Sequence, residues 1–512
     1  MTRRRRLLLL ALPLAVAAIA IGPWAVSRAG EPGSPPPTNS WRLDPPPNEA
    51  EIEGYASQVS AAPGETVQLH VSTNPAARYR VEVYRIGWYG GSGGKLVSCV
   101  PSCTDDEQGA AQAVPTPDPE TGELRAGWPV TNEVTPGSDW QSGYYLAKLV
   151  LTSGPDAGTS AGVPFVVRAP AGSQSAVLVV LPVNTWQAYN EWGGLSMYTN
   201  PRWAVKVSFD RPYAASDDQV FLDFPILRFI DQFGYDATYT TDADVDADPA
   251  DLTRHRLVVV GAHSEYWTKA MRDGFEAARG LGVNLAFLGG NTVYWQIRYA
   301  DADRRVLEEH RSASGDPLPN PRQKTVRWRD VPVLRPECGL VGVQWQGGDE
   351  TSDPGPHDYR VVAGSLDDPW FRGTGFKAGD AVRAAVGREW DAVDPECAKP
   401  APDLTVLFHY QGHTTPQQPG VYTSTFHSTN ADVVRYEAPS GSIVFAVGSI
   451  EFAWSLTGSA DGMPVADGVL DPGHPPDVRL QRLVRNAFAE MTASGTVTGS
   501  SVPRPSHISA VH

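Results

Sequence analysis

Hydrophobic and polar positions follow two different patterns along this chain. From residue 51 to about 170, short β-rich runs such as "ETVQLHVST" and "YYLAKLVLT" alternate with turns, which is typical of an antiparallel β-sandwich. From Ser175 onward, continuous apolar runs such as "SAVLVVLP" and "RLVVVGAH" alternate with segments of helical spacing. That alternation predicts strands covered on both faces and joined by helices. The sequence therefore predicts a multidomain β plus α/β protein whose second part, residues 171–495, is a doubly wound parallel sheet.

The helices of the second part are expected where apolar residues recur at helical spacing. Three such segments are "FLDFPILRFIDQFG", "TKAMRDGFEAARGLG" and the closing "PPDVRLQRLVRNAFAEMT". In the second of these, Thr268 is a good N-cap, and Gly280 or Gly282 is a good C-cap. Residues 300–440 are richer in Pro, Gly and polar residues, which predicts an insertion with additional β-structure.

The two ends of the chain lack the periodicity of the predicted domains. Residues 1–30 combine an arginine run with the apolar stretch Leu7–Val26, which predicts either an export signal, of the general or the twin-arginine type, or a membrane anchor. A proline-rich linker follows at 31–50, and 496–512 is expected to be a flexible tail. The protein is therefore expected to be exported, either to the extracellular space or to the cell surface.

Cysteine content and charge narrow the function classes. Four cysteines in an exported chain favour structural disulfides, and we expect the pairs Cys99–Cys103 and Cys338–Cys397. The formal net charge is -16, and no cluster of Lys and Arg follows the N-terminal segment. This excludes nucleic acid as the expected partner, because phosphate binding needs a basic face.

Chemistry-bearing residues follow the apolar runs, where ligands bind in open α/β sheets. The loops concerned are "NTWQAYNEWGG" (184–194), "HSEYW" (263–267), "GGNTVYW" (289–295) and "GSIEFAW" (448–454). No G-x-S-x-G or G-x-G-x-x-G follows a strand, and a lone His-x-Glu lacks the second histidine of a zincin. A carboxylate with phenol oxygens is a hard donor set that suits Fe(III), which makes an iron site one option.

Four stretches resemble a known family. They are "AHSEYW", "GGNTVYWQIR", "LPVNTWQAYNEWGG" and "YRIGWYGG", and together they resemble the large (beta) subunit of N,N-dimethylformamidase and its relatives. The resemblance implies an immunoglobulin-like β-sandwich at 51–170, followed by a glutamine-amidotransferase-like α/β domain. It also implies an amidohydrolase-like enzyme that uses mononuclear Fe(III) to hydrolyse the C–N bond of a small amide, and the N-terminal segment makes this an exported member.

The resemblance also implies roles for individual residues. Tyr145, Tyr189 and Glu265 correspond to metal ligands, with Tyr144 as the alternative to Tyr145. The remaining expected site residues are His263 for proton transfer, Asn291 for orienting the carbonyl or water, and Glu451 as a further acid or base. The family's small subunit is not on this chain, so the expected protein partner is either such a subunit or a second copy of the chain.

Two other functions stay open on sequence grounds. The chain could be a non-catalytic cell-surface binding module that kept the fold without the metal. It could also be a carbohydrate-active surface protein, because it contains 15 Trp and offers Glu265 and Glu451 as a carboxylate pair. Phenol oxygens converging on Glu265 would favour the metal hypothesis.

Overall fold

A computed structural model gives the fold of most of the chain. The described residues are 40–170, 172–173, 175–214, 219–348, 355–395, 403–416, 426–458 and 475–493. From Asn39 onward the chain forms one compact unit, so the domain boundaries expected from the sequence stay predictions. The expected export segment and the C-terminal tail lie outside the described residues. No described helix is both long and apolar enough to cross a membrane.

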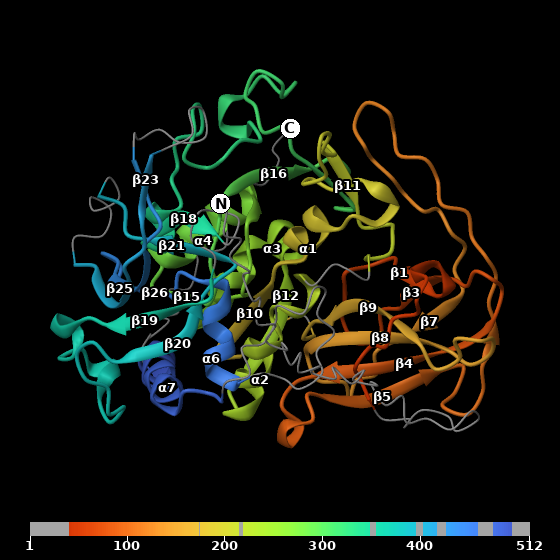
Figure 1. The fold of residues 1–512 in the computed structure, drawn as a ribbon, viewed down its shortest axis with the longest axis horizontal. Coiled ribbons are helices and arrows are strands. Elements are labelled where there is room, and N and C mark those ends of the chain that lie inside the picture. The colour runs from red at the N-terminus through yellow and green to blue at the C-terminus, as the bar shows by residue number, and fades with distance from the viewer. Residues whose placement is uncertain are drawn as a thin grey trace, which may run out of the picture. The chain divides into compact units, whose positions relative to one another are not determined.

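The N-terminal part consists of two β-sheets (Figure 1, red and orange). The smaller has the order β1-β3-β7, and the larger has the order β2-β9-β8-β4-β5, with β6 paired to β4. All pairings are antiparallel except that of β2 with β9. The strands are β1 (Glu53–Ala56), β2 (Ser60–Ala61), β3 (Val67–Ser72), β4 (Arg78–Ile86), β5 (Gly94–Val100), β6 (Glu107–Gln108), β7 (Asn132–Val134), β8 (Gly143–Leu151) and β9 (Ser160–Val167). Strand alternation is visible in β3, where Val67, Leu69 and Val71 enter a core shared with β4 and β8.

A nine-stranded sheet organises the second part, in the order β12-β10-β13-β15-β26-β25-β22-β19-β20. The first five strands are parallel, as predicted. The other four extend the sheet antiparallel, so the sheet is mixed and not the purely parallel sheet expected. The strands are β10 (Val177–Leu181), β12 (Ala237–Thr241), β13 (Leu257–Val260), β15 (Asn284–Phe287), β19 (His357–Val361), β20 (Ala381–Val386), β22 (Thr405–Tyr410), β25 (Ala431–Glu437) and β26 (Ile443–Ala446). The difference arises because the insertion pairs its own strands with the edge of the parallel sheet.

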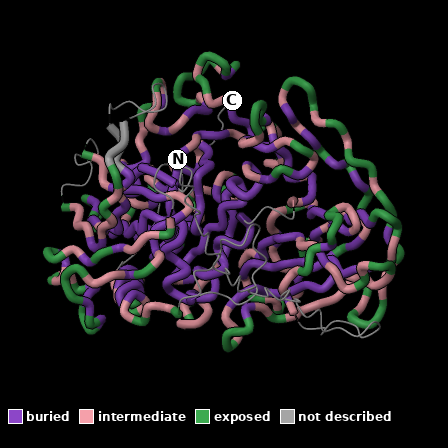
Figure 2. The backbone as a smooth tube through the Cα atoms, viewed as in Figure 1, coloured by how far each residue is buried: buried purple, intermediate pink, exposed green. Residues whose placement is uncertain are grey.

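Alternating residues of the parallel strands enter two different cores. In β10, Val177 and Val179 pack with α2 and α7, whereas Leu178 and Val180 pack with α4. Both faces are therefore covered, which explains why these strands read as continuous apolar runs; Figure 2 shows the same strands as buried tube. The helices are α1 (Val183–Tyr189), α2 (Phe224–Gln232), α3 (Asp242–Ala247), α4 (Lys269–Gly280), α5 (Cys338–Val341), α6 (Trp454–Thr457) and α7 (Val478–Ala493).

Smaller sheets lie beyond the ends of the parallel strands. A four-stranded sheet has the order β11-β17-β16-β14, and two pairs, β18 with β21 and β23 with β24, come from the insertion. Their bounds are β11 (Lys206–Ser208), β14 (Tyr266–Thr268), β16 (Trp295–Tyr299), β17 (Val306–Glu308), β18 (Gln344–Gly348), β21 (Glu389–Ala392), β23 (Thr414–Pro416) and β24 (Phe426–Ser428).

The structure confirms one predicted disulfide. Cys99 and Cys103 are joined in the β part. Cys338 is also disulfide-bonded, but its expected partner, Cys397, lies outside the described residues.

Candidate metal centre

The short helix α1 carries the first phenol of the site. It follows β10 directly and ends at Tyr189. The Tyr189 hydroxyl lies 2.9 Å from Oε2 of Glu265 and 3.2 Å from Oε1 of Glu389. The helix is tied to the neighbouring loop by Thr185, whose Oγ1 accepts a hydrogen bond from the backbone N–H of Glu265 at 3.0 Å. Tyr189 and Glu265 are therefore held together by both side chains and backbone.

His263 and Glu265 stand on the loop that follows β13, and both are buried. The Nδ1 of His263 donates to Oε1 of Gln219 at 2.8 Å, so the nitrogen of the ring that faces the carboxylates is Nε2. That nitrogen lies 3.4 Å from Oε2 of Glu265 and 3.8 Å from Oε1 of Glu389. A ring nitrogen facing two carboxylates is favourable only where it carries a proton or where a cation lies between the three groups.

The Gly-Gly-Asn loop after β15 approaches this group closely. A Cβ on Gly289 would lie 1.7 Å from the carbonyl oxygen of Ala262, and one on Gly290 would lie 2.5 Å from the carbonyl oxygen of Glu389. Only glycine fits at either position. The loop then places Asn291 at a φ of 48°, which is uncommon for a residue with a side chain.

Asn291 connects this loop to the insertion. Its Nδ2 donates to Oε2 of Glu389 at 2.6 Å, and its backbone N–H donates to Oδ1 of Asp391 at 2.8 Å. Burial raises the pKa of Asp391 to about 7. Glu389, at the start of β21, is thus positioned by the side chain of Asn291.

A second phenol reaches Glu265 from the loop between α1 and β11. The hydroxyl of Tyr198 donates to Oε1 of Glu265 at 2.7 Å. Its ring stacks on Tyr189 with the centroids 4.1 Å apart. Each oxygen of the Glu265 carboxylate therefore has a phenol beside it.

The side chains of the candidate metal centre carry too few protons to satisfy all of its hydrogen-bond acceptors. Burial, and after it the charge of Glu265, raises the pKa of Tyr189 and of Tyr198 well above the usual range. Tyr189 has only one proton for two nearby carboxylates. Within the described residues, the buried Nε2 of His263 and Oδ1 of Asn291 have no hydrogen-bond partner. A cation would satisfy the electron pairs and would lower the phenol pKa values by coordination.

The arrangement fits a metal ion. Ligand atoms of His263, Glu265 and Glu389 all lie within 4.8 Å of one another, and two phenol oxygens contact the same carboxylates. Carboxylate and phenol oxygens with an imidazole nitrogen are ligands suited to a first-row metal ion. This group of residues could therefore hold a metal; its donors do not identify the ion.

Comparison with protein families places the chain. The family described as "N,N-dimethylformamidase beta subunit-like, C-terminal" matches residues 80–465. The chain belongs to this family. None of the curated proteins compared with it matches. The match spans every residue of the candidate metal centre in this dimethylformamidase beta subunit-like chain.

The tyrosine expected as the second metal ligand, Tyr145 or alternatively Tyr144, lies elsewhere in this family member. Tyr145 stacks on Trp140 in the core of the β part, and its hydroxyl donates to the carbonyl of Gln141. Tyr144 points to the other face of β8, as strand alternation requires, and donates to the carbonyl of Val220 at 3.1 Å. The expectation that Tyr145 joins Glu265 is therefore corrected, because its hydroxyl bonds within the β part, while the Tyr144 hydroxyl bonds to Val220 in the second part.

Glu451 is also placed differently from its expected role. It lies on the short 3-10 helix after β26 and pairs with Arg388, with Oε1 3.0 Å from Nε. Arg388 directly precedes Glu389, so Glu451 borders the site through that ion pair. The other expected residues, Tyr189, His263, Glu265 and Asn291, are brought together.

Two residues of the dimethylformamidase beta subunit-like site were not expected from the sequence, Tyr198 and Glu389. Tyr198 lies just after the recognisable "NTWQAYNEWGG" stretch. Glu389 lies in "AAVGREW", an apolar run followed by glycine, a carboxylate and tryptophan, which is the same order as in "VVVGAHSEYW". That order was the available signal for Glu389.

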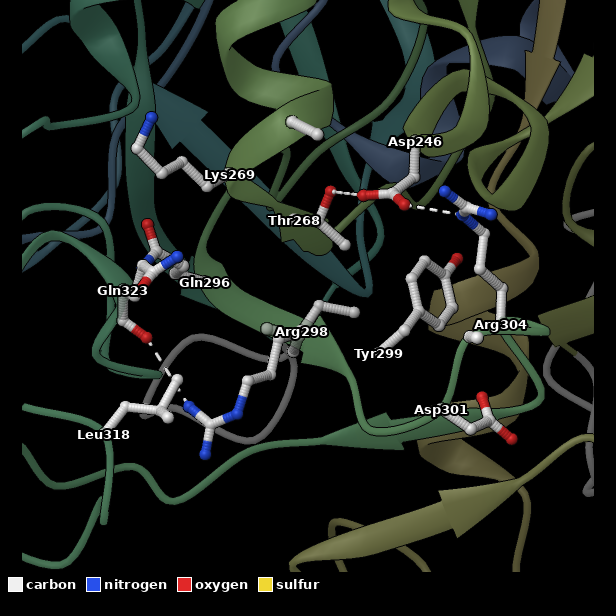
Figure 3. Close-up of a pocket in the computed structure, with 13 residues that line it drawn as sticks. Asp246, Thr268, Lys269, Gln296, Arg298, Tyr299, Asp301, Arg304, Leu318 and Gln323 are labelled. Carbon is white, nitrogen blue, oxygen red and sulfur yellow. Dashed lines mark hydrogen bonds and ion pairs between the residues drawn. The ribbon is translucent and has the colours of Figure 1, made fainter. Parts of the chain in front are cut away.

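A cavity of about 300 Å³ lies beside β14 and β16 (Figure 3). The charged groups that line it are engaged in ion pairs. Asp246 accepts from Thr268 and pairs with Arg304, as the dashed lines in Figure 3 mark. No residue of the candidate metal centre is among those that line it, so we distinguish it from that centre.

Proposed function

We propose that the protein is an Fe(III)-dependent hydrolase that cleaves the C–N bond of a small amide. The observation that carries this proposal is the convergence of two phenol oxygens on the buried carboxylate of Glu265, beside a histidine nitrogen without a hydrogen-bond partner in the described part of the chain. This is the arrangement expected to favour a metal site over a carbohydrate site. Family membership supports the amide as the substrate class.

Tyr189, Tyr198 and Glu265 are the residues that would hold the ion. They supply three oxygen donors of the hard type that Fe(III) prefers. Bound Fe(III) would supply Lewis acidity, which polarises the carbonyl of an amide. Burial of Glu265, which is 1% exposed, keeps water from competing with these donors.

Glu389 and His263 are the groups suited to proton transfer. The side chain of Glu389 is 24% exposed, whereas that of His263 is 3% exposed, so Glu389 is the carboxylate that a water molecule can reach. Glu389 would accept a proton from a water molecule while the oxygen of that water forms a bond to the carbonyl carbon of the amide. Asn291 keeps the Glu389 carboxylate oriented through its Nδ2.

Protonation of the leaving nitrogen completes the reaction. The proton taken by Glu389, or one passed through Nε2 of His263 at 3.8 Å, would be delivered to the amide nitrogen as the C–N bond breaks. Gln219 holds the imidazole in the orientation needed for this transfer. The products are a carboxylic acid and an amine, and both carboxylate and imidazole return to their starting states.

Metal analysis and a visible spectrum of the purified full-length chain test the proposal. We expect about one iron per chain and a tyrosinate-to-iron charge-transfer band. Tyr189→Phe, Tyr198→Phe and Glu265→Gln are each expected to weaken the band and to reduce the iron content. Hydrolysis of small formamides and other amides would then be screened with the iron-loaded protein.

Tyr145→Phe is the matched control, because it removes the hydroxyl of a buried tyrosine that lies in the core of the β part. It is expected to leave iron content and spectrum unchanged. A colourless, metal-free wild-type protein would contradict the hydrolase proposal and would favour the non-catalytic surface binding module.

Location and partners are part of the same proposal. We propose that the chain is exported, either released or anchored through residues 7–26, and that it works with a small subunit or a second copy of itself. Fractionation of the native host and the mass of the purified assembly test these two points.

A further inference from the structure

Arg311 lies against one of the two phenols of the candidate metal centre. Its guanidinium carbon is 4.9 Å from the centroid of the Tyr198 ring. Tyr198 in turn stacks on Tyr189 and donates to Glu265. Arg311 therefore contacts the phenol ring directly while its own polar atoms bond elsewhere.

The guanidinium is fixed by several other groups. Its Nε donates to Oε2 of buried Glu309 at 3.1 Å, and one of its terminal nitrogens donates to the hydroxyl of Tyr266 at 3.3 Å. It also lies over the rings of Trp295, at 5.0 Å, and Trp203, at 5.6 Å. A planar, permanently charged guanidinium can stack and donate in its plane at once, which an ammonium cannot do.

The backbone of Arg311 supports a specific role for this position. Its φ is 55°, in the left-handed region that is sterically unfavourable for a residue with a side chain. Such strain persists only where the surroundings determine the conformation. For Arg311, the contacts with Glu309, with Tyr266 and with three aromatic rings fix the conformation.

We infer that Arg311 is a positioning residue that holds the Tyr198 ring so that its hydroxyl stays beside Glu265. The backbone N–H of Tyr198 donates to Oγ of Ser196 at 3.0 Å, which fixes the start of the side chain. The direction of the ring beyond that point is set by its contacts with Tyr189 and Arg311. The part of this inference that concerns metal binding rests on the proposed function. Loss of a group that orients a metal ligand typically lowers metal affinity about 10- to 100-fold.

The test compares Arg311→Met and Arg311→Lys with Arg435→Met in the full chain. Arg435 is a matched control, because its guanidinium lies 4.3 Å from the ring centroid of Trp370 and pairs with Asp368 and Glu490, away from the metal centre. The exposed fractions of the two arginine side chains are similar, 19% for Arg311 and 14% for Arg435. Iron affinity, the charge-transfer band and the thermal midpoint are measured for each variant.

A second readout needs no metal. Protein labelled with 3-fluorotyrosine is examined by fluorine NMR in the metal-free state, and the Tyr198 signal is assigned with Tyr198→Phe. In the wild type, stacking is expected to displace this signal from the position of free fluorotyrosine. Arg311→Met is expected to move it toward that position, whereas Arg435→Met leaves it in place.

The outcomes separate the inference from the proposed function. We expect about a 10-fold or greater loss of iron affinity in Arg311→Met, a partial loss in Arg311→Lys, and wild-type affinity in Arg435→Met. Wild-type affinity together with an unmoved fluorine signal in Arg311→Met overturns the inference, as does full wild-type behaviour of Arg311→Lys. A wild type that binds no iron, but whose Tyr198 signal moves in the Arg311 variants, refutes the proposed function and leaves the positioning role standing.

Discussion

Gly289→Ala offers a sharp test of how the candidate site is assembled. The added Cβ would lie 1.7 Å from the carbonyl oxygen of Ala262, and ordinary contact begins at 3.4 Å. The two loops would therefore have to separate by about 1.7 Å, because the opposing atom is backbone and cannot rotate away. The separation would act on two site residues at once, since His263 follows Ala262 and Asn291 lies two residues after Gly289.

The expected magnitude follows from that displacement. Overpacking at a buried position costs about 1–3 kcal/mol of unfolding free energy. A misplacement of about 1 Å in a catalytic group costs on the order of 100-fold in rate. We therefore expect Gly289→Ala to lower the free energy of unfolding by about 2 kcal/mol, and to lower metal affinity and any amide hydrolysis by at least about 100-fold.

Gly280→Ala is the matched control for this experiment. Gly280 is the last residue of α4, and a Cβ there would meet nothing within 4 Å. We expect this change to be neutral or to stabilise the chain by up to about 1 kcal/mol. Chemical denaturation and metal titration of both variants are the measurements. A Gly289→Ala protein that binds metal as tightly as Gly280→Ala would refute the close approach of the two loops.

Two further predictions concern residues outside the metal centre. The Asp432 carboxylate, whose Oδ1 lies 2.7 Å from Nδ1 of His409, raises the pKa of His409; NMR titration should show this pKa fall in Asp432→Asn. Because the pKa of His409 is raised in the folded state, the pair contributes its full stabilisation at pH values below the unfolded-state pKa of about 6.5. This stabilisation is lost as the pH rises through the folded-state pKa. Thr268→Ala should cost about 1 kcal/mol of unfolding free energy, because Thr268 caps α4 by accepting from the N–H of Met271; an unchanged denaturation midpoint would argue against the cap.

The sequence predicted those parts of the fold that depend on local pattern. Continuous apolar runs identified β10 and β13, and helical spacing identified α2, α4 and α7, with Thr268 as the N-cap of α4. These features follow from burial on both faces of a strand and from local hydrogen bonds, and both can be predicted from the sequence of a single segment. The antiparallel half of the large sheet could not be predicted in this way, because pairing between distant segments leaves no periodic signal in either one.

The same limit applies to the candidate site. Tyr189 and Glu265 could be proposed because each lies in a recognisable stretch just after a predicted strand. Tyr198 could not, since a loop tyrosine carries no pattern that shows where its hydroxyl points. Tyr145 was wrongly expected at the site, because adjacent tyrosines on β8 gave no indication that both hydroxyls bond within the fold.

The insertion explains how the site becomes complete. Glu389 begins β21, and the next residue, Trp390, forms an antiparallel bridge with Ser449 in the loop after β26. Asp391 then accepts from the backbone of Asn291. These two links bring the Glu389 carboxylate of the insertion to a position 3.8 Å from Nε2 of His263, although the two residues lie far apart in the sequence. Bringing a second carboxylate beside buried Glu265 is unfavourable without a compensating positive charge. A cation that binds there would remove this cost, so metal binding and docking of the insertion should stabilise each other.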